Sequence, residues 1–581
     1  MMMTRAPAIL ATLGALTILV LSACDSGPRA DAIFVNAHVV TVDDDFAIAE
    51  AFAIVDGRFA TVGSEAEVRA AFPGGADVDE DLGGGTVLPG FNDNHIHLGP
   101  GGTLQEWQGG LVPGLPEWSA NAVMMDDLLT ALASEVARHE PGTWVEGGLT
   151  RMDWPNDKVP TRWQLDEIAP NHPVYITRGP HTYLLNSLAL RLAGIDRNTP
   201  DPEGGWIFRD ANGEPNGRVL EAARRLVDRV IPESATPART AEDGMASMRV
   251  SLGQLMALGI TSVNISGIRP TGVQAIRDLW TRYGEELPRA TMQVRLSPGH
   301  DTYDDGEEGI GTEIAALEAL DFKTGDGDDR FKIGAIKMSI DGGLSAPVFW
   351  SLEPYEGRPD FFGAIRIPDD IFYPVAKRAH ELGWQLGIHA MGDGAVKMVT
   401  EQMARILDED PRDDHRHFMH HVAVKPPQET IELMAEHGIM VASQPAFTVG
   451  LGAYAREALN DDRNATQNPT KSLQNAGVVV SHGSDSAPYG PLITIWTATT
   501  RIGFDGQVHG PEEAVSLEEA IRLHTRAPAY FNFDEEKKGA ILAGMYADFI
   551  LLSDDILSVA PEAIRDLTVT RTFVGGREIV R

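Results

Sequence analysis

The stretch Gly90-Phe91-Asn92-Asp93-Asn94-His95-Ile96-His97-Leu98 has the pattern of the end of a buried strand. Successive strand side chains point to opposite faces, so His95 and His97 point the same way. Imidazole is a common ligand of divalent metals, and two imidazoles at one strand end make half of a metal site. With 17 histidines among 581 residues, about half a His-x-His pair is expected by chance. The pair therefore needs further ligands from other parts of the chain.

The composition is that of a large globular protein with an acidic surface. Hydrophobic residues make up 43 % of the 581 residues, enough to fill the cores of more than one domain. The formal net charge of −36 argues against binding to nucleic acid, or to an anionic membrane through a basic patch. Acidic runs such as 43–45 and 304–308 lack the spacing of calcium-binding loops, so we interpret them as solvated loops.

The first 24 residues have the pattern of an export signal. A positive charge precedes an apolar run over 8–20 that is too short to span a bilayer comfortably. The run ends in Leu21-Ser22-Ala23-Cys24, which resembles the lipobox of bacterial lipoproteins, and Cys24 is the only cysteine of the chain. We therefore expect a lipid on Cys24, a tether over 25–31, and a protein anchored in the bacterial cell envelope on the periplasmic or extracytoplasmic face. The alternative is an ordinary signal peptide in which Cys24 merely precedes the cleavage site.

Both ends of the remaining chain are rich in strand patterns. Near the N-terminus, 33–42 and 51–62 alternate apolar residues, and Asp56-Gly57 is a strong hairpin signal. Near the C-terminus, 542–552 and 568–580 have a similar pattern. We expect residues 32–85 and 540–581 to pair in one small composite domain, similar to a β-sandwich, that keeps the two ends close together.

Between the two ends, short apolar segments alternate with stretches of helical pattern, which favours a parallel α/β architecture. Eight segments are candidate strands, the number that closes a TIM-like (β/α)8 barrel, here over 86–539. They are 86–95, 259–265, 291–297, 333–340, 385–390, 416–421, 440–445 and 478–485. The gap after the first strand is far longer than one crossover helix needs, so we expect an insertion over about 100–250 with strands at 144–149 and 173–177.

In such a barrel the chemistry lies at the C-terminal ends of the strands, where polar residues carry functional weight. Five of the candidate strands carry such residues at or just after their ends: His95 and His97, Lys337 before Asp341-Gly342, His389, His420-His421, and Asp485. In that order, they resemble the metal ligands of the amidohydrolase superfamily.

Further motifs make this resemblance more specific. The sequence is similar to the YtcJ-like branch, amidohydrolase family 3, which includes N-substituted formamide deformylases. The motifs are Arg178-Gly179-Pro180-His181 with 186–190, Gly204-Gly205-Trp206 with Gly213-Glu214-Pro215, Ser443-Gln444-Pro445, and Ala547-Asp548-Phe549. The resemblance covers about residues 32–581.

The resemblance implies a role for each of these residues. His95 and His97 would hold a first zinc ion, and His389 and His420 a second. Lys337, carboxylated on its amine, would bridge the two ions. Asp485 would contact the first ion and act as the catalytic acid and base, and His181 would reach from the insertion to the substrate carbonyl. Neutral imidazoles and carboxylates suit zinc, of which one or two ions would be bound.

Alternatives stay open at three of these positions. The sequence is the same whether Lys337 is carboxylated or is an ammonium group that pairs with Asp341. His181 could instead be a histidine whose ring is satisfied by backbone groups. On the sixth strand, four histidines lie close together, and aligning the family's Ile-Glu-His pattern with Phe418-Met419-His420 selects His420 as the ligand. The same alignment places Met419 where the family usually has a glutamate that supports a metal ligand.

The sequence thus predicts a zinc-dependent hydrolase that cleaves the carbon–nitrogen bond of a small N-substituted amide. The partners expected are that small molecule, the membrane through the lipid on Cys24, and, as a further option, a second copy of the chain. Two alternatives remain. One is a barrel that has lost catalysis and serves as a binding or regulatory lipoprotein. The other is an enzyme of the same fold that acts on a different bond, such as that of a lactone or cyclic ureide.

Overall fold

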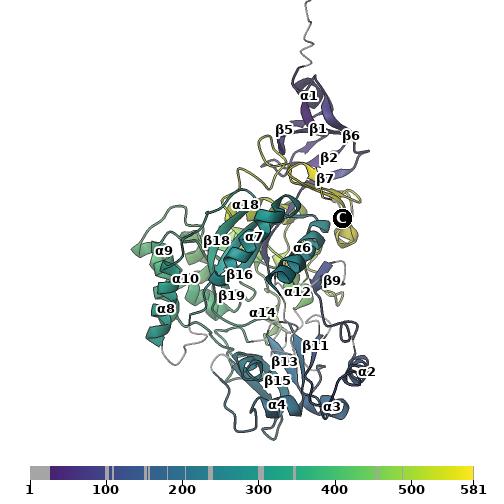
Figure 1. Ribbon diagram of the computed structural model, residues 1–581. Helices are drawn as coiled ribbons and strands as arrows, with labels where there is room; N and C mark the ends of the chain where they lie inside the picture. The colour runs from purple at the N-terminus through teal and green to yellow at the C-terminus, as the bar shows by residue number, and fades with distance from the viewer. Residues whose placement is uncertain are drawn as a thin grey trace, which may run out of the picture.

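The computed structural model consists of a central barrel, an insertion on one side of it and two small sheets on the opposite side (Figure 1). Cys24 and the export signal lie outside the described residues. The structure describes residues 27–579 except 99–103, 108–109, 123, 150–153, 155–157, 180, 203–204, 233–239, 299–305, 345–347, 452–454, 457 and 487. None of the helices within these ranges is long and apolar enough to cross a membrane.

The barrel is a parallel sheet of eight strands with the order β22-β21-β20-β19-β18-β17-β16-β8. Its strands are β8 (Phe91–Ile96), β16 (Ile260–Ile268), β17 (Arg289–Arg295), β18 (Phe331–Ser339), β19 (Leu386–Ala390), β20 (Phe418–His421), β21 (Met440–Ser443) and β22 (Val480–His482). Each overlaps one of the eight predicted segments, so the TIM-like barrel is confirmed. The strands are buried on both faces, as expected for a parallel sheet covered by helices.

The first predicted strand differs in one respect, because 86–95 divides at Gly90 into two strands. β7 (Thr86–Pro89) belongs to the terminal sheets, and β8 begins the barrel. A Cβ atom on Gly90 would lie only 2.1 Å from Thr261 Oγ1 on the neighbouring strand β16. Glycine therefore allows the close approach at which the chain passes from one sheet to the other.

Hydrogen bonds join the two outermost strands of the barrel. The amide of Asp485, just after β22, donates to the carbonyl of His95 at 2.8 Å, and Asn94 Nδ2 donates to Ser481 Oγ at 2.6 Å. The sheet is thereby almost closed, and the segment that carries His95 lies beside the segment that carries Asp485.

Amphipathic helices cover the outside of the barrel. In α7 (Val273–Tyr283), for example, the buried residues Val273, Ile276, Leu279 and Trp280 recur at helical spacing. The helices between successive barrel strands include α7, α8 (Gly306–Glu318), α9 (Asp369–Glu381), α10 (Asp393–Glu409), α11 (Gln428–Glu436) and α15 (Thr470–Asn475). α6 (Ala241–Ala257) precedes β16, and α16 (Pro491–Thr500), α17 (Leu517–His524) and α18 (Arg526–Phe531) follow β22.

Two sheets, one made of N-terminal strands and one that combines strands from both ends of the chain, form the predicted sandwich-like unit. One sheet contains β5 (Arg58–Gly63), β4 (Ala51–Val55), β1 (Ala30–Val35) and β6 (Ala76–Asp81). The other contains β25 (Arg577–Glu578), β24 (Val569–Val574), β23 (Phe549–Leu552), β7, β2 (His38–Val40) and β3 (Ile48–Ala49). Phe34, Phe52, Phe549 and Phe573 pack together between the sheets. The hairpin predicted at Asp56-Gly57 joins β4 to β5.

A buried ion pair links this unit to the barrel. Arg289, at the start of β17, donates to both carboxylate oxygens of Asp548, at 2.7 and 3.1 Å. Both side chains are almost fully buried.

The insertion has a sheet and cores of its own. Its strands are β11 (Val145–Leu149), β12 (Val174–Arg178), β13 (Thr182–Leu185), β15 (Pro215–Glu221) and β14 (Gly205–Arg209), in that order across the sheet. Separate hydrophobic clusters, such as those around Leu165 and Val219, hold it together. It lies below the barrel in Figure 1, on the side away from the terminal sheets.

Candidate metal centre

Three predicted ligands converge where β8 and β22 end. His95 Nε2 lies 3.1 Å from His97 Nε2, and Asp485 Oδ1 lies 3.0 Å from His97 Nε2 and 3.5 Å from His95 Nε2. Ligand atoms are about 3.3–3.4 Å apart when each lies about 2.0–2.1 Å from one tetrahedral zinc ion. The spacing of the three side chains is therefore that of ligands that share one metal.

The backbone of Asp485 directs its carboxylate toward this point. Asp485 and Ser486 have φ angles of 48° and 63°, in the left-handed region that non-glycine residues rarely occupy. Asp93, two residues before His95, accepts hydrogen bonds from the amide and hydroxyl of Ser484. This contact and the backbone hydrogen bond between Asp485 and His95 hold the turn in place. They thereby maintain the strained left-handed backbone at Asp485 and Ser486, beside the metal ligands.

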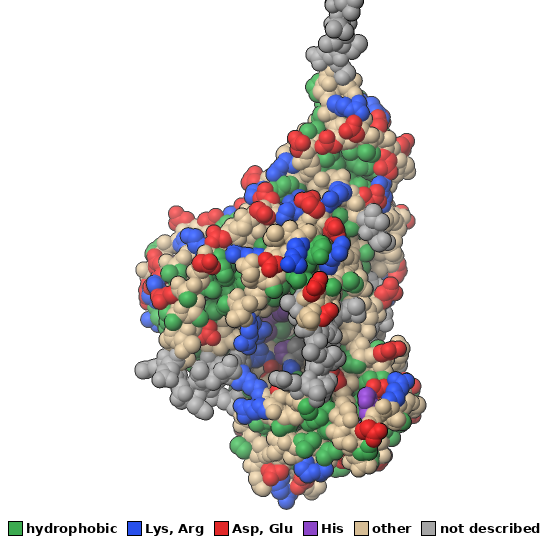
Figure 2. Space-filling model, in the orientation of Figure 1, with side chains coloured by type: hydrophobic (Ala, Val, Ile, Leu, Met, Phe, Trp, Pro, Cys, Tyr) green, Lys and Arg blue, Asp and Glu red, His purple; other side chains and the backbone are tan. Residues whose placement is uncertain are grey.

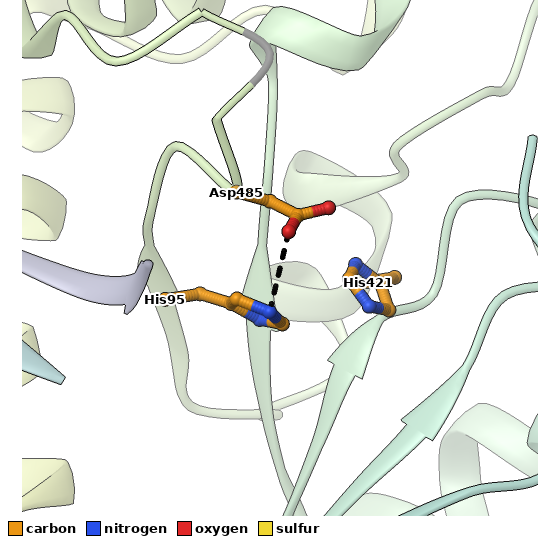
Figure 3. Close-up of side chains that lie close together, drawn as sticks. All are labelled: His95, His421 and Asp485. Atoms are coloured by element: carbon orange, nitrogen blue, oxygen red, sulfur yellow. Dashed lines mark ion pairs between the residues drawn. The ribbon is translucent and has the colours of Figure 1, made fainter. Parts of the chain in front are cut away.

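On β20 the structure brings His421 into the group. Ligand atoms of His95, His421 and Asp485 all lie within 4.8 Å of one another, and Figure 3 shows these side chains facing a common point. His421 Nδ1 is 2.7 Å from Gln444 Oε1, which accepts its proton because Gln444 Nε2 donates to the carbonyl of Ala442. The other ring nitrogen, Nε2, is therefore the one left to bind a metal.

His420, the predicted ligand of β20, lies outside this group of three. Its Nε2 is 3.0 Å from Gln293 Oε1, and Gln293 in turn donates to Asn264 inside the barrel. The left-handed φ angles of His421 (77°) and Val422 (51°) break the alternation of the strand. His421 can therefore turn toward the barrel mouth while His420 keeps the inward direction that the alternation gives it.

Lys337 and His389 lie on the neighbouring strands β18 and β19. Lys337 is buried, and its Nζ has no hydrogen-bond partner within the described part of the chain. His389 Nε2 lies 3.4 Å from Asp341 Oδ1. Asp341 accepts hydrogen bonds from the amides of Trp350, Met391 and Gly392, so its carboxylate is fixed in place beside His389. Asp341 is thus bound by backbone amides, and no ion pair links it to Lys337 among the described residues.

Burial keeps these bases neutral. It lowers the pKa values of His95, His389 and His421 well below the ordinary value of histidine, and at His389 and His421 it outweighs the opposing charge of Asp485. Burial likewise lowers the pKa of Lys337 well below that of an exposed lysine. A neutral imidazole or amine has a free lone pair, which metal binding requires.

His181 reaches the same region from the insertion. Its Nδ1 lies 2.8 Å from Glu221 Oε1, and Glu221 also pairs with Arg366 from the loop after β18. Burial raises the pKa of Glu221, but the positive charges of Arg366 and His181 outweigh it and lower the pKa to about 2. A Cβ atom on Gly343 would lie 2.7 Å from His181 Nε2, so that nitrogen lies against the loop that follows β18. His181 is therefore paired with a side chain, and not only with backbone groups.

Comparison with known proteins agrees with this geometry. Residues 80–580 match the sequence model of the amidohydrolase family. The chain belongs to the amidohydrolase family. The N-substituted formamide deformylase of Arthrobacter pascens is 29 % identical to this amidohydrolase over 555 residues, which cover 94 % of this chain and 97 % of that protein. YtcJ of Bacillus subtilis is 26 % identical over 554 residues, covering 94 % and 98 %. The predicted family is thereby confirmed.

Solved structures show the same fold. An uncharacterized metal-dependent hydrolase from Pyrococcus horikoshii superposes on this amidohydrolase with a TM-score of 0.65 at 20 % identity, covering 91 % of this chain and 99 % of that one. A metal-dependent hydrolase from Pyrococcus furiosus gives a TM-score of 0.62 at 22 % identity, with the same coverage.

The residues of this amidohydrolase fit a bound metal on independent grounds. Two buried nitrogen atoms of the proposed ligands have no hydrogen-bond partner within the described part of the chain, namely Lys337 Nζ and His389 Nε2. An unsatisfied buried polar group is costly, and such groups rarely gather in one place without a ligand. The donor set of imidazoles and carboxylate is also the one that zinc prefers.

Sequence reasoning missed the residues that support the ligands. The sequence marks Gln444 only as part of a family motif, although its side chain orients His421. No local signal in the sequence marks Gln293, Glu221 or Arg366, since each acts through a residue distant in the sequence. Asp93 could have been found, because it lies two residues before His95 on the same strand.

Proposed function

We propose that this amidohydrolase uses zinc to hydrolyse the carbon–nitrogen bond of an amide in a small N-substituted molecule. The observation that carries the proposal is the convergence of His95, His97, His421 and Asp485 at the C-terminal ends of the barrel strands. The N-substituted formamide deformylase, 29 % identical over nearly the whole chain, supports the choice of bond. Figure 2 shows a hollow between the barrel and the insertion in which histidine side chains are visible, a suitable place for a small substrate.

The proposed ligands follow from the positions of the side chains. His95, His97 and Asp485 would hold one zinc ion. His389 and a histidine of β20 would hold a second, with Lys337 carboxylated on Nζ between the two. For β20 we favour His421 over His420, because Gln444 fixes its Nδ1 proton and leaves Nε2 free. When bound, zinc would lower the pKa of a water molecule to near neutrality and polarise the substrate carbonyl.

The chain's own residues supply the proton transfers. Asp485 accepts a proton from the attacking water at a carboxylate oxygen and passes it to the departing nitrogen, so that the amine leaves neutral. His181 Nδ1 lies 2.8 Å from Glu221 Oε1, so Nε2 is the ring nitrogen left for the substrate carbonyl. The Glu221–Arg366 pair holds His181 in that orientation.

The test is hydrolysis by the purified chain. Zinc-loaded protein should release formate and amine in equal amounts from N-substituted formamides, lose the activity on treatment with a chelator, and regain it on addition of zinc. Failure of zinc-loaded protein to cleave any amide in a panel of N-formyl and N-acetyl compounds would overturn the proposal. The same assay should also be run with lactones and cyclic ureides. Turnover of one of these compounds in place of the amides would favour the alternative of an enzyme that acts on a different bond.

We also propose that Cys24 carries a lipid and anchors the protein in the cell envelope. The support is the sequence Leu21-Ser22-Ala23-Cys24 after an apolar run. Expression in a bacterium should place the wild-type chain in the membrane fraction with a diacylglycerol mass on Cys24. The Cys24→Ala variant should lose both the added mass and the membrane association. An unmodified wild-type chain cleaved after residue 24 would favour the ordinary signal peptide.

A further inference from the structure

Arg295, at the end of β17, lies at the mouth of the barrel beside the proposed metal ligands. Gln293, two residues earlier, is fully buried and contacts His420 inside the barrel. Strand alternation therefore directs Arg295 to the same inner side, one step closer to the mouth. Its partner in the neighbouring strand β18 is Lys337.

Gly267, near the end of the neighbouring strand β16, lies beside the Arg295 stem. A Cβ atom on Gly267 would lie 3.4 Å from Arg295 Cδ and 3.5 Å from Lys337 Cγ. Gly267 has a φ of 94°, which other residues rarely adopt, so the backbone conformation favours glycine there. The Arg295 stem lies in the space that a larger residue at 267 would fill.

The charge of Arg295 is not balanced within the described part of the chain, where it has neither a hydrogen bond nor an ion pair. Burial lowers the pKa of Arg295, and the positive charges of Arg366 and Arg269 lower it further. Arg366 pairs with Glu221, whereas no carboxylate of the described residues pairs with Arg295.

The contrast with Arg289 is informative because both residues lie on β17. Arg289 is buried at the other end of the strand and pairs with Asp548 through both carboxylate oxygens. The chain has 84 acidic residues against 48 lysines and arginines, so a carboxylate partner is easily supplied. Among the described residues, the charged groups that act on the partly buried Arg295 guanidinium are the cations Arg366 and Arg269, so the site has the properties of one whose anion comes from outside.

We propose that Arg295 binds a carboxylate of the substrate while the amide lies at the Asp485 side of the barrel mouth. This inference rests on the proposed function and narrows its substrate class to N-substituted amides that carry an anionic group. Arginine presents two parallel N–H donors that match the two oxygens of a carboxylate. Lys and Arg side chains line the hollow in Figure 2, although the chain as a whole is strongly acidic.

The experiment compares two amides that differ only in charge, 4-(formamidomethyl)benzoate and 4-(formamidomethyl)benzamide. The zinc-loaded wild-type chain should have a kcat/KM about 10–100-fold higher for the carboxylate, carried mainly by KM. Arg295→Gln should abolish most of this ratio, and Arg295→Lys should restore part of it. Arg282→Gln, an exposed residue of α7, is the matched control and should keep the wild-type ratio. A purely structural role of Arg295 would lower both activities and leave their ratio unchanged.

A binding measurement separates this inference from the proposed function. Calorimetry should show that benzoate binds to the wild-type chain and binds at least tenfold more weakly to Arg295→Gln. The affinity of Arg295→Lys for benzoate should lie between the two. If benzoate binds in this way but neither amide is cleaved, the proposed function fails and the anion site stands. A wild-type chain without preference for the carboxylate, or equal benzoate binding by wild type and both variants, would overturn the inference.

Discussion

His421 Nδ1 and Gln444 Oε1 lie 2.7 Å apart, and this hydrogen bond fixes which ring nitrogen of His421 faces the metal centre. The amide of Gln444 cannot flip without cost, because its Nε2 donates to the carbonyl of Ala442 at 2.9 Å. A histidine that binds a metal through one nitrogen commonly donates the other N–H to such an acceptor, which fixes the tautomer.

Removal of this acceptor should weaken zinc binding. We expect Gln444→Leu to lower zinc affinity by about 10–100-fold, because His421 loses both its orientation and its preferred tautomer. Competition with a chelator of known affinity measures the change. Gln274→Leu, on the exposed face of α7, is the control and should bind zinc like wild type. Unchanged zinc affinity in Gln444→Leu would contradict the role assigned to the hydrogen bond.

The two histidines of β20 should differ in their effect on metal content. His421→Ala should lower bound zinc by about one ion per chain, since its free nitrogen faces His95 and Asp485. His420→Ala should retain more zinc, because His420 Nε2 is bound to Gln293. Metal analysis of freshly purified protein decides the matter. The reverse order of loss would restore His420 as the ligand of this strand.

The difference between these two histidines shows where sequence reasoning reaches its limit. Strand patterns and the order of polar strand ends were enough to predict the eight barrel strands and the family. The choice of His420 assumed that β20 continues as a regular strand, whereas the backbone turns left-handed at His421. Such a turn has no signal at a non-glycine residue. Arg295, Glu221 and Arg366 could not be predicted because their importance depends on partners far away in the sequence.

Replacement of the proposed proton carrier should abolish most of the activity. We expect Asp485→Asn to lower kcat by about 10²–10⁴-fold, because an amide cannot accept and return the proton. Formate release under saturating substrate measures the effect, and zinc analysis in parallel shows how much metal the variant keeps. Asp566→Asn, at an exposed carboxylate far along the chain, should retain full activity. Wild-type turnover by zinc-loaded Asp485→Asn would exclude the proposed proton transfer.

The buried pair between Arg289 and Asp548 should matter for stability and not for chemistry. Asp548→Asn leaves the guanidinium of Arg289 buried without its counter-charge, so we expect a loss of about 3–5 kcal/mol in the free energy of unfolding. Glu401→Gln, which removes a half-exposed helix pair with Lys397, should cost no more than about 0.5 kcal/mol. Urea denaturation compares the two variants. Equal effects would show that the buried pair does not stabilise the junction between the barrel and the terminal sheets.

Glu221 should make stability depend on pH in the acidic range. Its pKa in the folded protein is about 2, below its ordinary value of 4.5, so its charge stabilises the fold above about pH 5. The contribution is lost progressively as the pH falls toward 2 and the carboxylate takes up a proton. Glu221→Gln removes the negative charge beside the buried Arg366 at every pH. We expect the difference in unfolding free energy between wild type and this variant to shrink by about 2 kcal/mol from pH 7 to pH 3.

Urea denaturation of the metal-free proteins at the two pH values tests this expectation without interference from zinc. Glu436→Gln, at an exposed carboxylate of α11, is the control and should show no such change. If the difference between wild type and Glu221→Gln is the same at both pH values, the charge of Glu221 does not stabilise the fold. The Glu221–Arg366 pair would then act only by positioning His181, and Glu221→Gln would lower activity without a pH-dependent loss of stability.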